Sequence, residues 1–323
     1  MIRIVDTVAD ACQRTAGNFP YFAATAADTD AFINTMKDVL LGRGWTLAAS
    51  GTETGHPFYK LDSAQSPWWD PDVTPPAIYN GRVRVKIKAS SNSLVRFQCM
   101  STDETFIQNA AREFTFGAGP AGNWRYIVTP CQFVMMHATG NFNWMVISAI
   151  HTPRWFQEAG LEECFICTGG ASNGYQIGLY SGGNQFYRIK SAMPGLYSSD
   201  IKQDYTDATN GPRVMGFTTY FGGTTNARLV NPEDDSACND ATKRAPFHIP
   251  AAVALPVRVF ADQENSWRWL GWYWDGIVMC APPPTGSLRP HTDQFDNGMV
   301  FESMTLSNSA GSTLPGMLMF RTQ

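Results

Sequence analysis

Hydrophobic periodicity predicts one helix near the start of the chain. An apolar stripe at helical spacing is formed by Phe32, Ile33, Met36, Val39 and Leu40. The segment Asp28-Thr29-Asp30 supplies capping oxygens and negative charge at the start of this stripe. Gly42 and Gly44 follow it, as expected for a left-handed C-terminal cap, and Trp45-Thr46-Leu47 is expected to form the first strand. The pattern therefore predicts a short helix that packs on a sheet.

Strict alternation of polar and apolar residues predicts a pair of antiparallel strands after this unit. Residues 82–87 and 94–100 alternate, and Ser90-Ser91-Asn92-Ser93 lies between them as a turn. The alternation puts four cations on one face of the first strand: Arg82, Arg84, Lys86 and Lys88. The ordinary interpretation of such a row is a sheet face in contact with solvent. The alternative is a surface that binds an acidic partner.

Two long apolar runs predict the centre of the core. Residues 124–136 and 143–150 flank Gly140-Asn141, which is typical of a β-hairpin. Their hydrophobicity is continuous rather than alternating, so we expect both faces of these strands to be buried. Between the two hairpins, residues 106–116 are expected to form a short helix.

Two segments interrupt the rhythm of strands and turns. The segment Ser66 to Tyr79 is rich in proline, which cannot donate to a β-ladder, and we expect an irregular arm that also carries Trp68 and Trp69. Residues 191–250 are polar with little periodicity and are expected to form extended loops. Further strands are expected at residues 58–61, 164–168, 175–180, 186–189, 213–221, 250–260, 267–280, 300–306 and 316–321.

These elements predict a mainly β fold, sandwich-like, with antiparallel sheets, a short N-terminal helix and minor α+β content. The polar tract indicates a boundary between two units. Residues 1–195 would hold the N-terminal helix and a β-rich domain, and residues 196–323 a loop-rich segment and a second β-rich unit. A single domain is the alternative.

The composition changes this picture in one respect. Only 16% of the residues are charged, against about 25% in an average soluble domain, while the chain holds 10 Trp, 11 Tyr and 20 Phe. Either a large core or partner chains must cover so much uncharged surface, since interfaces are depleted in charge and enriched in aromatics. The net charge of −4 gives no electrostatic footprint for direct nucleic-acid contact. Without an apolar run of about 18 residues, no membrane contact is expected.

The residues that carry chemistry do not assemble into a known catalytic pattern. Cys164 and Cys167 are the one close pair among seven cysteines, and a four-thiolate zinc site needs a second pair. Of the five histidines, only His137 and His151 flank one hairpin, where folding could bring them together. Phosphate-loop, dinucleotide-binding and nucleophile-elbow motifs are missing. The sequence therefore predicts no catalytic residue, no metal site and no cofactor.

Acidic pairs leave one enzymatic alternative open. Asp70 and Asp72 in the arm, and Glu233 and Asp234 in the polar tract, could supply the two carboxylates of a glycan hydrolase. Nothing in their spacing selects a particular pair, and solvated loop charges are the ordinary interpretation.

The segment from Trp267 to Asp275 is the most aromatic part of the chain. Alternation would place Trp267, Trp269 and Tyr273 on one face, with Trp272 and Trp274 on the other if the strand is regular. Aromatic ladders can stack on sugars, but aromatics on both faces favour a strand buried in its own core and against a neighbour. We therefore favour a protein interface over a sugar site.

The N-terminal helix, the Gly44-Trp45 entry to the sheet, the strand from Trp124 to Pro130, the proline-rich arm and the tryptophan-rich late strand occur together. In this arrangement the chain resembles virion structural proteins of tailed bacteriophages, particularly tail and baseplate components. The resemblance implies a β-rich subunit that assembles as a ring of several copies, with arms that reach onto neighbours. It supplies no catalytic residue.

The expected function is thus that of a structural virion subunit, assembled in the host cytoplasm and not an enzyme. Its partners would be copies of itself and other virion proteins, with a glycan contact as an additional option. The interface residues that we expect are Trp68, Trp69, Tyr79, Trp267, Trp269 and Trp272. A carbohydrate- or receptor-binding module of a phage tail that uses the same tryptophans is the alternative, followed by the glycan hydrolase.

Overall fold

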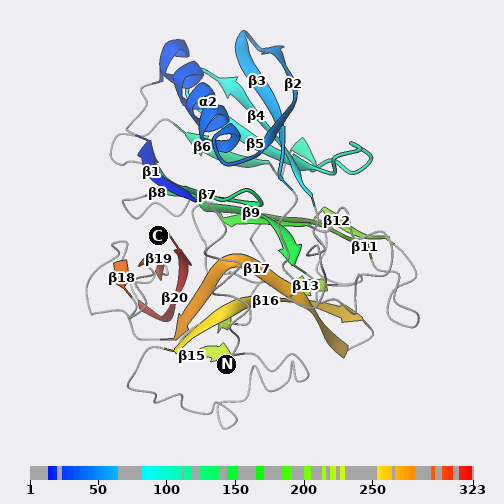
Figure 1. Cartoon of the computed structure of the whole chain (residues 1–323), viewed down its shortest axis with the longest axis vertical. Helices are drawn as coiled ribbons and strands as arrows, with labels where there is room; N and C mark the ends of the chain where they lie inside the picture. Colours follow the sequence, from blue (N-terminus) through cyan, green and yellow to red (C-terminus); the bar gives the residue numbers. More distant parts are fainter. Residues whose placement is uncertain are drawn as a thin grey trace, which may run out of the picture.

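The structure is mainly β, which confirms the predicted fold class (Figure 1). It is a computed structural model, and it describes residues 14–19, 24–64, 82–110, 113–117, 124–137, 144–151, 165–170, 184–190, 200–204, 213–215, 219–222, 226–229, 253–263, 266–280, 292–294, 300–307 and 313–321. Within these ranges every strand pairing is antiparallel and α2 is the one helix.

The elements follow one another along the chain as β1 (Thr15–Phe19), α2 (Ala26–Leu41), β2 (Thr46–Glu53), β3 (His56–Asp62), β4 (Arg84–Ser91), β5 (Leu94–Met100), β6 (Phe114–Gly117), β7 (Trp124–Val128), β8 (Gln132–His137), β9 (Trp144–His151), β10 (Phe165–Gly170), β11 (Asn184–Lys190), β12 (Asp200–Asp204), β13 (Arg213–Met215), β14 (Thr219–Gly222), β15 (Asn226–Leu229), β16 (Val253–Gln263), β17 (Ser266–Cys280), β18 (Thr292–Gln294), β19 (Val300–Ser307) and β20 (Thr313–Arg321).

Helix α2 forms where the apolar stripe predicts it, but its ends differ from the prediction. Thr25, not the Asp28 segment, is the N-cap: its hydroxyl oxygen accepts a hydrogen bond from the backbone N–H of Asp28 at 3.2 Å. At the other end Gly42 keeps right-handed helical angles, and Gly44 is the residue with a positive φ, of 87°. The chain then reverses into β2, and the indole N–H of Trp45 donates to the carbonyl of Thr129 at 2.8 Å.

A five-stranded sheet follows in the order β2-β3-β4-β5-β6. The predicted hairpin of β4 and β5 is confirmed, with Ile87 opposite Phe97 and the turn at Asn92 and Ser93. Its inward residues alternate with polar ones, so one face is apolar and lies against α2 and the layer below. The predicted first strand is therefore the edge strand β2 of this sheet, and β1, which the sequence pattern did not indicate, precedes it.

The prediction of a helix over residues 106–116 was wrong. Ile107 makes an isolated bridge to Met100, and β6 pairs with β5. At the start of this segment the Ser101 hydroxyl accepts from the backbone N–H of Phe106 at 3.0 Å, which closes a turn over residues 101–106. Phe114 and Phe116 are buried at a spacing of two, which fits a strand.

A second, 13-stranded sheet contains β1, β7, β8 and β9 side by side. The predicted hairpin across Gly140-Asn141 is confirmed as β8 paired with β9. The run from residue 124 to 136 is not one strand, however, because the chain turns at Pro130 and divides it into β7 and β8. Both faces of this part are buried, as expected: Met135 and Met145 lie in the core cluster, while Val134 and Val146 occupy the opposite face and are also fully buried.

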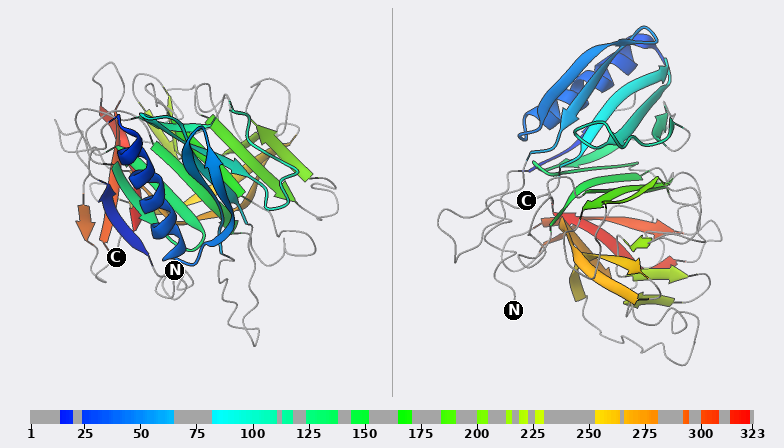
Figure 2. Two further views of the ribbon diagram at one scale, coloured as in Figure 1. Left: turned by 90° about the horizontal axis from the view of Figure 1, so that it is seen from above. Right: turned by 90° about the vertical axis from the view of Figure 1, so that its right-hand side faces the viewer.

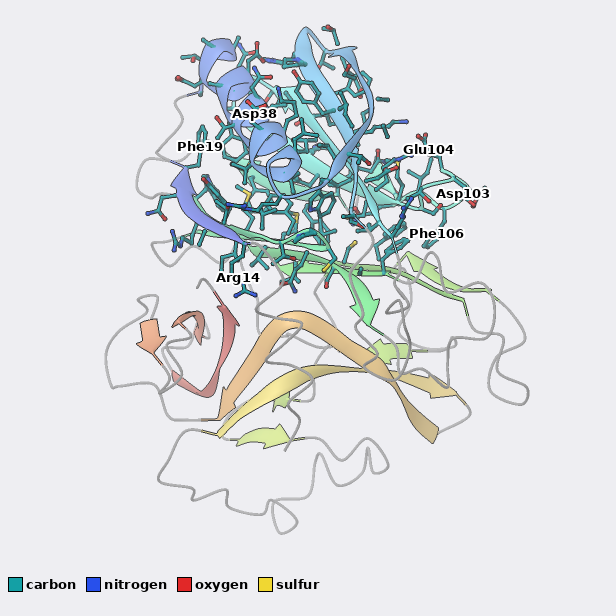
Figure 3. The ribbon with its side chains drawn as sticks, viewed as in Figure 1. Arg14, Phe19, Asp38, Asp103, Glu104 and Phe106 are labelled. Carbon is teal, nitrogen blue, oxygen red and sulfur yellow. The ribbon has the colours of Figure 1, made fainter. Side chains whose placement is uncertain are left out.

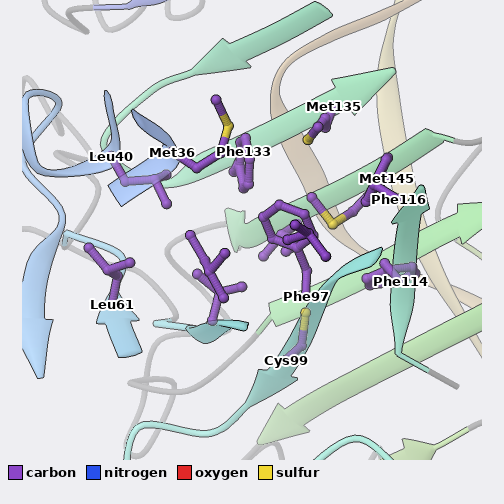
Figure 4. Close-up of a cluster of buried hydrophobic side chains, with 14 of the residues drawn as sticks. Met36, Leu40, Leu61, Phe97, Cys99, Phe114, Phe116, Phe133, Met135 and Met145 are labelled. Carbon is purple, nitrogen blue, oxygen red and sulfur yellow. The ribbon is translucent and has the colours of Figure 1, made fainter. Parts of the chain in front are cut away.

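The main core lies between the two sheets, with α2 filling one side (Figures 1 and 4). Phe97 of β5 is at its centre. Its ring centroid is 5.2 Å from that of Phe116 in the same sheet and 5.5 Å from that of Phe133 in the other. Phe19 of β1 reaches the helix, with its ring 4.5 Å from that of Phe32. Aromatic contacts of this kind join α2 and the two sheets.

Strands β16, β17, β19 and β20 form a third layer, on the far side of β7–β9 from the five-stranded sheet (Figure 2). The long hairpin of β16 and β17, here called the β16–β17 ribbon, is attached to β9 through Trp272–His151 and Tyr273–Ile150. The predicted strand over residues 213–221 is two strands, β13 and β14. The predicted boundary at residues 195 and 196 stays a prediction, and the pairing of β11 with β12 crosses it.

Candidate assembly surfaces

The β16–β17 ribbon brings together three of the six interface residues expected from the sequence. Its register pairs Trp267 with Asp262, Trp269 with Phe260 and Trp272 with Arg258. Positions directly opposite in an antiparallel pair share a face. Because residues 258, 260 and 262 alternate along β16, the three tryptophan positions lie on one face of the ribbon.

This grouping corrects the expected alternation of the tryptophans. A regular strand would separate Trp272 from Trp269, but the register shifts between Val259 and Phe260, where Gly271 and Trp269 are the partners. Leu270 is thus the extra residue of a β-bulge, and the alternation reverses beyond it. Tyr273, expected beside Trp267 and Trp269, is adjacent to Trp272 and falls on the opposite face.

The sequence does contain a signal for the irregular register. Gly271 stands in the middle of an apolar strand, where glycine often marks a bulge. Pro256, in β16, coincides with a second register shift between Pro256 and Arg258. Both residues can be read from the sequence. The sequence does not show which side chains share a face, because that depends on how β16 pairs with β17.

The predicted cationic face of β4 has carboxylate partners on neighbouring strands and on the loops after β5; one of them, Glu104, is labelled in Figure 3. The guanidinium of Arg84 makes a paired contact with the Asp62 carboxylate, at 2.5 and 2.8 Å, and reaches the Glu104 carboxylate at 2.7 Å. Lys60 lies on the other oxygen of Glu104 at 2.6 Å. These bonds raise the pKa of Arg84 and lower the pKa of Glu104.

The same arrangement continues toward the turn of the hairpin. Lys86 contacts the carboxylate of Glu53, and its ammonium lies 4.5 Å from the centre of the Phe58 ring. Lys88 lies 2.9 Å from Glu113, a carboxylate with no exposed surface, which Arg96 approaches at 3.6 Å. The interpretation as a freely solvated face was therefore wrong for Arg84, Lys86 and Lys88, whose side chains are each only 15% exposed. Arg82 precedes the strand.

Other candidates from the sequence are separated or buried. His137 lies at the turn end of the β8–β9 hairpin and His151 at the far end of β9, so the fold keeps them apart. Cys167 is fully buried beside Cys99, and burial raises the pKa of its thiol, which disfavours the reactive thiolate. The described ranges hold no group of three or more metal-binding side chains. Nor do they hold a helix of the length and apolarity needed to cross a bilayer.

A histidine that the sequence did not single out has a partner on each ring nitrogen. His56 begins β3, and its Nδ1 lies 2.7 Å from the Asp30 carboxylate of α2. Its Nε2 lies 3.0 Å from the side-chain oxygen of Asn92 in the β4–β5 turn. His56 thus joins the helix to two turns of the sheet, which is a structural role.

The remaining expected site residues lie outside the described residues. These are the arm residues Trp68, Trp69 and Tyr79 and the four acids Asp70, Asp72, Glu233 and Asp234, together with Cys164 and the expected strand at residues 175–180.

Comparison of the chain with protein-family models, with curated proteins and with solved structures finds no match.

Proposed function

We propose that the chain is a structural subunit of a tailed-bacteriophage virion, a tail or baseplate component that acts through protein–protein contacts and not as an enzyme. The observation that carries the proposal is the bulge at Leu270, which places Trp267, Trp269 and Trp272 on one face of the ribbon. Clustered tryptophans are the residues that dominate the binding energy of protein interfaces.

The composition of that face favours a surface over a core. The positions opposite Trp267 and Trp272 are Asp262 and Arg258, so charged residues alternate with the aromatic ones across the ribbon. A fully buried face seldom carries such residues unless they are paired, whereas interfaces combine aromatic anchors with a polar rim.

The position of the ribbon agrees with this role. It belongs to the third layer, so the five-stranded sheet does not reach it (Figures 1 and 2). On the edge of β17 away from β16, Trp272 and Tyr273 pair with β9, and Gly276 to Met279 pair with β20. In the described chain, the part of β17 that holds Trp267 and Trp269 pairs with β16 alone.

The resemblance to tail and baseplate proteins of tailed bacteriophages implies assembly as a ring of copies. A sparsely charged, aromatic-rich chain with a proline-rich arm fits a ring of copies in which arms and loops are buried between subunits. The arm residues Trp68, Trp69 and Tyr79 would then belong to the same kind of contact.

The test is the triple variant Trp267→Ala, Trp269→Ala and Trp272→Ala. It is expected to keep the circular dichroism spectrum of the wild type and to lose the full-size assembly in native mass spectrometry. Tyr273→Ala is the matched control, because it removes an aromatic residue from the opposite face of the same strand. Full-size assemblies of the triple variant would contradict the proposal, as would unfolding of the triple variant with assembly intact in the control.

The arm is tested separately by Trp68→Ala combined with Trp69→Ala. This double variant is expected to fold and to fail to assemble, since the two indoles would be contributed to a neighbouring subunit. Particles of full size from this variant would restrict the interface to the ribbon.

A glycan-binding module is the second candidate, and the same bulge favours it. Three tryptophan positions in a row on one face of a strand form a surface on which sugar rings can stack. Quenching of tryptophan fluorescence by oligosaccharides, lost in the triple variant, would support this candidate, whereas an unchanged signal together with subunit assembly supports the structural role.

A further inference from the structure

Strand β2 is an open edge of the five-stranded sheet. The order β2-β3-β4-β5-β6 puts it at one end, and in the described chain its pairing partner is β3. Six of its eight residues are exposed. The other edge strand, β6, has its phenylalanines buried. An open edge presents backbone N–H and C=O groups that another strand can bond.

The residues of β2 do little to block such an addition. Natural edge strands are protected by lysine, proline, bulges or inward charges. Here the sequence Thr-Leu-Ala-Ala-Ser-Gly-Thr-Glu holds one charged residue, Glu53, and its carboxylate is already engaged by Lys86. A bulge is present, but it lies between Leu47 and Ala49 and leaves the stretch from Ala49 to Glu53 regular.

We propose that β2 pairs antiparallel with β2 of a second copy of this chain, so that two five-stranded sheets join edge to edge. The strand carries one charge, at Glu53, and small side chains around its middle. With the two-fold axis at Ser50, Ala49 comes to lie opposite Gly51, and the bulge between Leu47 and Ala49 of each copy lies beside the Thr52–Glu53 end of the other. The two Glu53 carboxylates stand at opposite ends of the ladder, so like charges do not oppose each other.

Two further features favour a second copy as the occupant. Leu47 is 48% exposed, one of the few large apolar side chains exposed in the described residues, and the pairing would cover it. The proline-rich arm, which follows β3 in the sequence, is a poor strand because proline cannot donate to the ladder. An isologous contact of this kind is the commonest form of protein self-association.

This contact does not depend on the proposed function. β2 lies at one end of the molecule and the β16–β17 ribbon at the other, in both views that show its long axis (Figures 1 and 2). The two surfaces can therefore be removed one at a time, and the triple tryptophan variant is expected to keep the β2 contact.

A charge-swap experiment tests the pairing. Ser50→Lys and Ser50→Glu each place two like charges across the two-fold axis, whereas a mixture of the two variants places opposite charges there. Each variant alone is expected to raise the dissociation constant of the dimer about ten-fold or more, and mixing is expected to restore it. Ala31→Lys, at an exposed position on α2, is the control for added charge. Sedimentation velocity measures the masses.

Hydrogen exchange supplies a second measurement that does not rely on the variants. In the wild type the amides of residues 46–53 are expected to become protected as the protein concentration rises, and Ser50→Lys is expected to abolish this change. Exchange that is independent of concentration overturns the pairing, and so does a Ser50→Lys dimer as tight as the wild type. Loss of the dimer in the triple tryptophan variant alone would assign the contact to the ribbon.

Discussion

The cationic face of β4 and the tryptophan face of β17 look alike in sequence, since each repeats one kind of residue along a strand, but the fold treats them differently. Arg84, Lys86 and Lys88 find carboxylates on neighbouring strands of their own sheet and on the loops after β5. Trp267, Trp269 and Trp272 are gathered on one face by a bulge, next to alternating charged positions. Alternation therefore predicts which residues share a face. Whether these residues find partners in the same chain depends on segments that are distant in the sequence.

The comparison predicts two kinds of variant. Substitution of a residue with partners in the same chain should lower the free energy of unfolding and leave assembly of the folded fraction intact. Substitution of an interface residue should abolish assembly and leave the free energy of unfolding unchanged.

Phe97→Ala should give the largest loss of stability. The ring of Phe97 is fully buried and touches aromatic rings of both sheets, so its removal leaves a cavity between them. We expect the free energy of unfolding to fall by about 4 kcal/mol. Urea titration followed by tryptophan fluorescence measures this change. A loss below about 1 kcal/mol would mean that the two sheets do not share this core.

Glu113→Ala should give the second-largest loss of stability. The carboxylate of Glu113 is fully buried between Lys88 and Arg96, and its removal leaves two largely covered cations without their shared partner. The expected cost is about 3 kcal/mol. Glu53→Ala is the matched control, because Glu53 contacts the same Lys88 but its side chain is 38% exposed. Equal losses in the two variants would show that burial of the pair does not matter here.

Asp62→Ala, at the other end of β4, should reduce stability less than Glu113→Ala and leave assembly unchanged. It removes the paired hydrogen bonds to Arg84, where both side chains are only 15% exposed, and should cost about 2 kcal/mol. Native mass spectrometry of the same variant should show the wild-type assembly. If assembly were lost and stability kept, the cationic face would be a partner surface after all.

Lowering the pH should produce the smallest of these changes in stability. The pKa values of Glu53 and Glu104 lie below their ordinary value of 4.5, chiefly because of the hydrogen bonds from Lys86 and Lys60. Their stabilisation is thus complete above pH 4.5 and is lost as the pH falls through the lowered values. Because both carboxylates are about one-third exposed, each should contribute less than about 1 kcal/mol. Thermal unfolding across this range should show a shallower acid decline in Glu104→Gln, and an unchanged slope would refute the ion pair.

Much of the fold could be predicted from local patterns. The apolar stripe located α2, and the alternation around Asn92 located the β4–β5 hairpin, because both signals come from residues close in sequence. The continuous apolar run of β8 and β9 correctly indicated burial on both faces. The failures have physical causes: Pro130 divides one run into two strands, and residues 106–116, expected as a helix, contain Ile107, which bridges to Met100, and Phe114 and Phe116 of β6, which pairs with β5.

The candidate sites were harder to predict. The tryptophans of β17 were identified, but their common face depends on a bulge whose position only the pairing with β16 defines. The cations of β4 were identified too, yet Glu104 and Glu113 become their partners only through the loops after β5. Trp45-Thr46-Leu47 indicated the start of β2, but the position of this strand at an edge of the sheet depends on the strand order and could not be predicted.

The most direct test of assembly as the role of this chain is the mass of the purified wild-type protein over a wide range of concentration, measured by sedimentation equilibrium. Subunits that complete one another's surfaces should converge on a defined multiple of the single-chain mass as the concentration rises. A protein that stays at the mass of one chain at every concentration, and stays in solution, would contradict that role.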